Sequence, residues 1–266
     1  MPSASLGQAL LRSAAGSLAA LVLSVWLWGW KAGPVVAGIA SVLWVILVFA
    51  WRSVRLDEDA LPARIKARLA QHDPVLRLAV ALAQPMRGLA LAMPIPAPAR
   101  RIDAPGQYGI GHLSGDELAK AGEEVQAWLD HAQELAGGLP LPGGFAQIAA
   151  LFLATPAEAA DGAAPEPEPA AVLCYRLHVL LCGMETGALP LAAGRALVAP
   201  AVRALQARYP DWQRYAADLR QEQWHFVRRT LWGKAALAVH LKDLLGQPLS
   251  PWAITELRLA LPPPPA

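Results

Sequence analysis

The sequence is poor in charge and nearly devoid of cysteine. Charged residues make up 17% of the 266 residues and hydrophobic residues 55%, whereas an average soluble protein has about 25% charged residues. This balance excludes an intrinsically disordered chain, which needs low hydrophobicity and high charge, and it argues against a purely soluble protein. Two cysteines cannot build a disulfide scaffold, and a net charge of +2 is too small to indicate nucleic-acid binding.

Familiar catalytic motifs are also missing. The sequence has no G-x-S-x-G, no Walker phosphate loop, no H-E-x-x-H, and no G-x-G-x-x-G that follows a strand. No stretch of alternating β-branched residues is long enough to predict a sheet. We therefore expect a mainly α fold and a protein without catalytic activity, cofactor or metal.

Two uncharged runs lie near the start of the chain, at residues 13–30 and 34–51. A helix over either run would be ~27 Å long, which is close to the thickness of the hydrocarbon core of a bilayer. Gly33-Pro34 favours a turn between them. The pattern predicts a transmembrane hairpin over residues 13–51. The alternatives are a cleaved signal peptide, which lacks a small-x-small cleavage site here, and a buried helical pair, which usually has a polar face.

Basic residues set the expected orientation of this hairpin. Only Lys31 lies in the short connection, whereas five basic residues follow the second run: Arg52, Arg55, Arg64, Lys66 and Arg68. Positive charge stays on the cytoplasmic side of a membrane. We therefore expect a multi-pass protein of the bacterial inner membrane with both termini in the cytoplasm.

Proline-rich segments divide the rest of the chain, and the segments between them have helical patterns. The predicted organisation is a tail at 1–12, the hairpin at 13–51, juxtamembrane helices and a proline-rich spacer at 52–105, a helical segment at 106–154, a flexible linker at 155–170, a C-terminal helical domain at 171–260, and a proline-rich tail at 261–266. Residues 56–92 have two interpretations. Their helices lie in the membrane interface, or they belong to the core of the cytosolic region.

Local signals place several helices. Ser114 and Glu117 have the spacing of a capping box, which predicts a helix to about Leu135 with a stop at Gly137-Gly138. Ser250-Pro251 is typical of a helix start. Further helices are predicted near 144–154, 171–186, 191–208, 211–231, 234–245 and 250–260. Within 211–231, one face is expected to be core: Trp212, Tyr215, Ala216, Leu219, Gln223, Phe226 and Thr230.

One helix carries a possible metal-binding pattern. Glu222 and His225 form an E-x-x-H, and Asp218 lies one turn earlier on the same face. Di-iron carboxylate bundles need two such helices, and the nearest second pattern is His131 and Glu134 in reversed order. The simpler interpretation is a polar helix face with internal ion pairs.

The two cysteines lie on one predicted helix. Cys174 and Cys182 are eight residues apart, so helical rise separates them by ~12 Å. A disulfide needs Cα atoms within about 7 Å, so both are expected to be reduced core residues. His178 lies one turn from each, but the set lacks a fourth zinc ligand.

Residues 171–226 resemble the YbeU/YbeR-like family, a bacterial helical domain of unknown function. The resemblance rests on Arg176, Gly187, Ala196, Asp211-Trp212, Tyr215 and Trp224. It implies that Arg176 matches the arginine of the family's Asp-x-x-Arg, although Leu173 stands where the aspartate would be. Asp211 replaces a serine, and the glycine before the last tryptophan is absent, with Gln221 nearby. The resemblance implies no particular reaction, and Arg176 is expected to cap or clamp neighbouring helices.

Charge is unevenly distributed along the chain. Residues 100–170 carry three basic and eleven acidic groups, and residues 171–266 carry eleven basic and six acidic. The two regions either lie against each other or are ordinary solvated faces.

The functional expectation is a membrane-anchored protein whose helical cytosolic region binds a protein partner, for example an immunity or secretion-accessory protein. The alternatives are a metal-dependent enzyme that uses Asp218, Glu222 and His225, and a structural membrane component that oligomerises through the hairpin.

Overall fold

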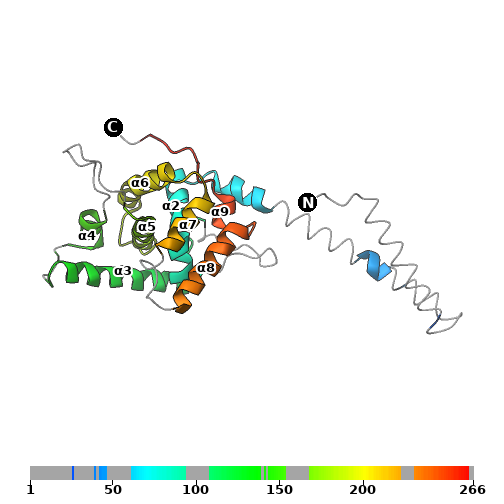
Figure 1. The fold of residues 1–266 in the computed structure, drawn as a ribbon, viewed down its shortest axis with the longest axis horizontal. Helices are drawn as coiled ribbons and strands as arrows, with labels where there is room; N and C mark the ends of the chain where they lie inside the picture. Colours follow the sequence, from blue (N-terminus) through cyan, green and yellow to red (C-terminus); the bar gives the residue numbers. More distant parts are fainter. Residues whose placement is uncertain are drawn as a thin grey trace. The chain divides into compact units, whose positions relative to one another are not determined.

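The computed structural model describes Trp26, Ile39 and residues 42–46, 61–93, 108–138, 141, 143–153, 168–222 and 231–263 (Figure 1). The chain divides into two compact units, Met1–Leu61 and Pro62–Ala266. We call them unit 1 and unit 2. The segments predicted at 106–154 and 171–260 therefore share one unit.

Unit 2 is helical throughout the residues that the structure describes, and no strand occurs among them. Residues 61–69 form a first helical stretch that begins with the last residue of unit 1. The labelled helices are α2 (Pro74–Ala90), α3 (Gly115–Leu135), α4 (Phe145–Phe152), α5 (Ala170–Glu185), α6 (Leu191–Arg208), α7 (Trp212–Gln221), α8 (Leu231–Gly246) and α9 (Pro251–Ile254). The prediction of a mainly α fold is confirmed for these residues.

Helix α5 is the centre of unit 2. It contacts α2, α3, α4, α6 and α7 (Figure 1). Its residues are buried on every side, as in Leu177, Val179 and Leu180, and its polar Arg176 and His178 are buried and paired. A helix without a polar face is stable in water only when other helices surround it, and this explains its central place.

Helix α2 is the second core helix. Asp73 caps its start by accepting from the amides of Val75 and Leu76, and Pro74 occupies the first position. Residues 78–85 are buried without a break. Of the two interpretations of residues 56–92, the structure supports the core helix for this part, because α2 has no face left for a membrane interface.

The predicted capping box of α3 is confirmed. Ser114 Oγ accepts from the amide of Glu117, and Glu117 Oε2 accepts from the amide of Ser114. At the other end, Gly137 and Gly138 have φ of 71° and 77°, which only glycine adopts without strain. The predicted helix at 144–154 is present as α4.

Replacing Ser114 with alanine is expected to destabilise unit 2 by about 1 kcal/mol, because the Glu117 amide loses its acceptor. Urea denaturation followed by circular dichroism measures the change. Ser114→Asp is the control, since aspartate also accepts at this position and keeps most of the stability. Equal stability of all three proteins would contradict the role of the cap.

Two helices are shorter than predicted. Helix α7 ends at Gln221, and the carboxylate of the next residue, Glu222, accepts from the amide of Ala171 at the start of α5 at 2.8 Å. Helix α9 begins at the predicted Ser250-Pro251 but ends at Ile254. Side chains of α6 and α7 bond the backbone carbonyls that follow it, and those bonds replace helical ones.

The predicted core face of 211–231 is partly described. Tyr215, Ala216 and Leu219 are buried, and Trp212 is half-buried. Gln223, Phe226 and Thr230 lie outside the described residues. Where the structure describes this face, the prediction is confirmed.

No helix within the described residues is long and apolar enough to cross a membrane. The predicted hairpin lies outside them except for Trp26, Ile39 and residues 42–46, which are helical. Most of the predicted linker at 155–170 and of the spacer at 94–105 is likewise outside the described part of the chain.

Candidate functional site

The predicted metal face is an ion-pair network in the structure. Tyr209 donates to Asp218 at 3.1 Å, and Arg208 and Arg214 lie within 3.7 Å of its carboxylate. Arg208 also lies 3.8 Å from Glu222. Only the Arg214 pair is internal to α7, because Arg208 comes from α6. His225 lies outside the described residues.

The second part of the predicted metal-binding pattern, His131 and Glu134, is exposed. His131 Nδ1 lies 3.6 Å from Glu134 on the surface of α3, and both side chains are more than half exposed. Within the described ranges, no group of three or more His, Cys, Asp or Glu residues could hold a metal ion.

Both cysteines are buried and reduced, as predicted. Cys174 Sγ donates to the carbonyl of Leu82 at 3.4 Å, and burial raises the pKa of its thiol to about 12. A thiol with this pKa is not a nucleophile near neutral pH. Cys174 therefore acts as a packing residue between α5 and α2.

The structure brings Cys182 and His178 together with Glu124 of α3, which sequence reasoning did not single out. His178 Nε2 lies 3.2 Å from Glu124 Oε2, and its Nδ1 lies 3.7 Å from Cys182 Sγ. Burial alone would lower the pKa of His178, but the Cys182 sulfur and the Glu124 carboxylate outweigh it and raise that pKa to about 9. The bond from His178 in turn lowers the pKa of Glu124.

Cysteine, histidine and a carboxylate are the residue types of a catalytic triad. The placement of these three side chains does not suit a nucleophile. The side chains of His178 and Cys182 are fully buried. Neither lines a pocket among those found in unit 2. The cluster instead ties α3 to α5 through a charged pair.

Because the pKa of His178 is higher in the folded chain than the ordinary value of 6.5, the folded state binds the extra proton. The free energy of unfolding is therefore expected to fall as the pH rises from about 6.5 through about 9. Urea denaturation at a series of pH values measures this slope. His178→Gln should flatten it, and an unchanged slope in that variant would contradict the assignment.

Arg176, the residue carried by the family resemblance, binds the segment that precedes its own helix. Its guanidinium forms two bonds to Glu168, at 2.8 Å and 2.7 Å, and thereby fixes the chain just before α5. Leu173 is buried, so the carboxylate comes from eight residues upstream of Arg176 and not from the position of the family aspartate. Gly187 has φ of 75°, which suits a glycine turn, and Trp224 lies outside the described residues.

A second ion pair is buried completely. Arg87 Nη2 of α2 lies 2.6 Å from Glu185 Oε1 at the end of α5, and the two side chains are 0% and 1% exposed. The amide of Gly111 donates to the other carboxylate oxygen at 2.7 Å. This pair joins three segments that are far apart in the sequence.

Few ion pairs join the acidic and basic regions of the sequence, although α3 packs against α5. Among the described residues only two ion pairs join residues 100–170 to 171–266, namely Glu124 with His178 and Glu168 with Arg176. Asp116, Glu123, Asp130 and Glu134 of α3 are exposed. For the most part the charged regions are solvated faces, which was one of the two interpretations.

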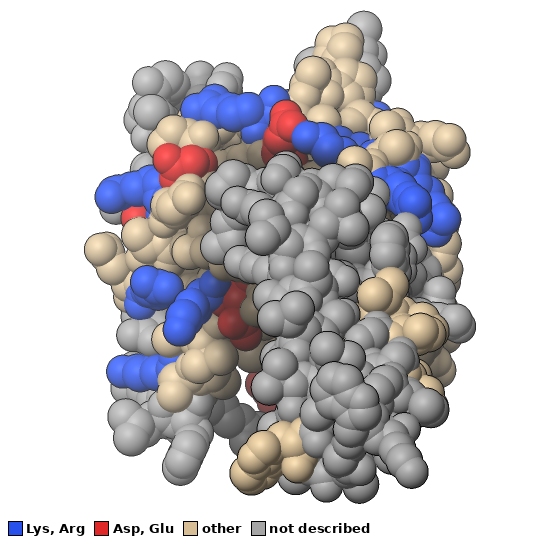
Figure 2. Space-filling view, turned by 90° about the vertical axis from the view of Figure 1, so that its right-hand side faces the viewer, with Lys and Arg blue, Asp and Glu red and all other residues tan. Residues whose placement is uncertain are grey.

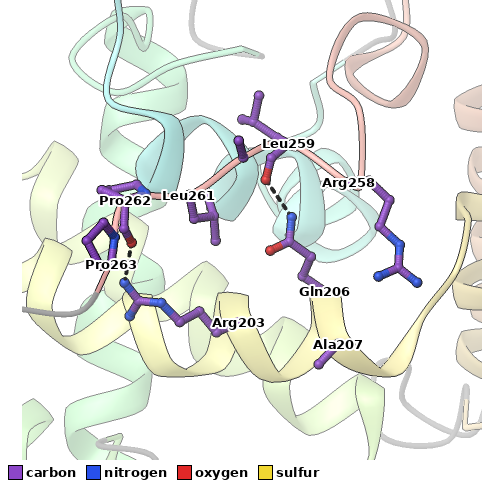
Figure 3. Close-up of a pocket in the computed structure, with 9 residues that line it drawn as sticks. Arg203, Gln206, Ala207, Arg258, Leu259, Leu261, Pro262 and Pro263 are labelled. Atoms are coloured by element: carbon purple, nitrogen blue, oxygen red, sulfur yellow. Dashed lines mark hydrogen bonds between the residues drawn. The ribbon is translucent and has the colours of Figure 1, made fainter.

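An open hollow of unit 2 lies between α6 and the segment that follows α9 (Figure 3). We call it the α6 groove. It is an open cavity of about 490 Å³, and it is lined by Arg203, Gln206, Ala207, Arg258, Leu259, Ala260, Leu261, Pro262 and Pro263. No acidic, cysteine or histidine side chain is part of this lining.

Two side chains of α6 hold the far wall of the groove. Gln206 Nε2 donates to the carbonyls of Leu257 and Leu259 at 2.9 Å and 2.7 Å. Arg203 Nη2 donates to the carbonyl of Pro262 at 3.0 Å. Figure 3 shows both side chains rising from α6 to this segment. Arg258 is exposed and has no ion-pair partner in the described part of unit 2.

Comparison with protein-family models, with curated proteins and with solved structures gave no match. The resemblance to the YbeU/YbeR-like family therefore stays a prediction from the sequence.

Proposed function

We propose that the protein is a non-catalytic binding module that is tethered to the bacterial inner membrane and binds an acidic, extended segment of a protein partner in the α6 groove. The groove carries this proposal. It combines an exposed arginine and a second arginine with leucine and proline side chains, which suits a peptide with carboxylates and apolar residues. The absence of acids, cysteine and histidine from its lining favours binding over catalysis. An immunity or secretion-accessory protein is one form of such a module.

The membrane tether is the hairpin predicted at residues 13–51, with both termini in the cytoplasm. Its described residues support it, because six large apolar side chains on helical segments of unit 1 are exposed. Exposed apolar residues on a helix are costly in water and are typical of lipid contact. These are Trp26, Ile39, Val42, Leu43, Trp44 and Ile46.

A labelled peptide of alternating glutamate and leucine with a central proline tests the groove. Fluorescence anisotropy with the full-length protein in detergent measures binding, and the same peptide with lysine for glutamate is the specificity control. Arg258→Glu is expected to weaken binding of the acidic peptide about tenfold. Arg220→Glu is the matched variant, because Arg220 is an exposed arginine of α7 outside the groove lining.

Failure of the acidic peptide to bind would count against the groove, as would an equal loss of affinity in both variants. Metal analysis of the purified protein tests the enzyme alternative. Stoichiometric iron, manganese or zinc that is lost on Glu222→Ala would overturn the proposal of a binding module.

A further inference from the structure

The helical residues 61–69 have one face fixed against unit 2. Ile65 and Leu69 lie four residues apart, so they share a side of the helix, and they pack against Tyr108 and Ile254. Leu69, Tyr108 and Ile254 are 3% to 7% exposed. This packing decides which residues of the helix point outward.

The outward face is basic. Arg64 and Arg68 are exposed and lie four residues apart on one side of the helix, whereas the exposed Lys66 lies on its opposite flank. Residues 60–72 contain no acidic residue, and Asp57, Glu58 and Asp59 precede them in the sequence. Figure 2 shows unit 2 from the side on which this helix emerges in Figure 1, and most of the described charged side chains on that side are lysine or arginine. We call Arg64 and Arg68 the basic face.

Polar contacts fix this helix as well. Arg77 Nη1 of α2 donates to the carbonyl of Leu69 at 2.9 Å, which satisfies a free carbonyl at the helix end. Lys66 forms an ion pair with Glu256. The basic face therefore belongs to the body of unit 2 and keeps its orientation.

The chain brings the basic face close to the predicted membrane. The second predicted membrane run ends at residue 51, and residues 52–60 separate it from the helix. Nine residues reach at most about 32 Å, since an extended residue spans up to about 3.5 Å. The negative potential of the cytoplasmic leaflet decays within about 10 Å, so it attracts the basic face when this connection is folded back and the face lies near the lipid.

We propose that the basic face docks on anionic lipid headgroups and thereby lays unit 2 against the membrane surface. This inference rests on the membrane tether of the proposed function. Opposite charges supply the attraction, and the apolar contacts of Ile65 and Leu69 present the charges in a fixed array. The acidic helix α3, with six acidic residues and one lysine, is expected to stay away from the lipid.

The test uses the full-length protein in nanodiscs of phosphatidylcholine alone or of an equal mixture with phosphatidylglycerol. Ala67→Cys places a fluorophore on the basic face, because Ala67 is exposed and both native cysteines are buried. A spin label on lipid headgroups quenches the fluorophore when the face lies on the membrane. We expect quenching in the mixed discs, little in phosphatidylcholine, and loss of quenching in high salt. Gln133→Cys on α3 is the control position.

Charge-reversal variants test whether the docking depends on this face or only on the net charge of the protein. Arg64→Glu with Arg68→Glu should abolish the quenching. Lys234→Glu with Lys242→Glu changes the net charge equally at two exposed lysines of α8 and should leave it unchanged. Quenching that is equal with and without phosphatidylglycerol would overturn the docking. Quenching that is lost equally in both pairs of variants would overturn it as well. Preferential binding of the basic face to RNA or to an acidic protein would also overturn the docking on lipid. A full-length protein that stays soluble without detergent would instead refute the tether.

Discussion

Arg87→Ala is expected to destabilise unit 2 by about 3–5 kcal/mol, because it leaves the Glu185 carboxylate buried without its counterion. The two side chains are 0% and 1% exposed, so water cannot replace the guanidinium. The Gly111 amide, which donates to Glu185 at 2.7 Å, cannot neutralise the charge. Urea denaturation of the full-length protein in detergent, followed by circular dichroism, measures the loss.

Two control variants test whether the unpaired buried charge causes this loss of stability. Lys66→Ala removes the exposed pair with Glu256, whose side chains are 54% and 65% exposed, and should change the free energy of unfolding little. Arg87→Met combined with Glu185→Leu replaces both charges by apolar groups and should recover much of the stability. A double variant as unstable as Arg87→Ala would show that packing, and not the unpaired charge, causes the loss.

Trp252→Ala is expected to cost about 3–5 kcal/mol, the usual range for removing a buried tryptophan. Trp252 is 4% exposed, and its ring is stacked on that of Trp212 with centroids 4.9 Å apart and planes 5° apart. Its Nε1 donates to the carbonyl of Ala81 at 2.8 Å, so the substitution also leaves a buried carbonyl of α2 without that donor. Urea denaturation again measures the change.

A spectroscopic signature distinguishes the stacked pair from packing alone. Stacked indoles couple electronically, so the circular dichroism of the native protein should change in Trp252→Phe as well as in Trp252→Ala. Trp252→Phe keeps most of the buried volume and is expected to be the more stable of the two. An unchanged spectrum in both variants would contradict the stacking.

Local signals in the sequence predicted the helices well. The capping box at Ser114 and Glu117 and the start at Ser250-Pro251 depend on residues within four positions of each other, and such bonds form whatever the rest of the chain does. The ends of α7 and α9 were missed, and the bonds near them join distant segments. Glu222 bonds the start of α5, and the carbonyls after α9 accept from Gln206 of α6. Both partners are far away in the sequence.

The ion pairs show the same difference between what local sequence predicts and what distant contacts decide. Arg87 is the only charged residue between Arg77 and Met93, and a lone charge in an apolar helix is a signal that could have singled it out. Its partner Glu185 lies 98 residues away, and no spacing rule connects them. Glu124 and Glu168 could not be assigned either, because one carboxylate on a polar stretch looks like another until folding places it beside His178 or Arg176.

The sequence by itself determined that the chain is helical, where most of the helices begin, and that its cysteines are reduced. These properties depend on the backbone, on local capping and on the period of apolar residues, which are all written within a few residues. Only the tertiary structure decided which charges pair, that the buried Cys182 and His178 meet the partly exposed Glu124, and that arginines and prolines form the α6 groove. Those features depend on contacts between distant segments, and their geometry exists only once α5 is surrounded by its neighbours.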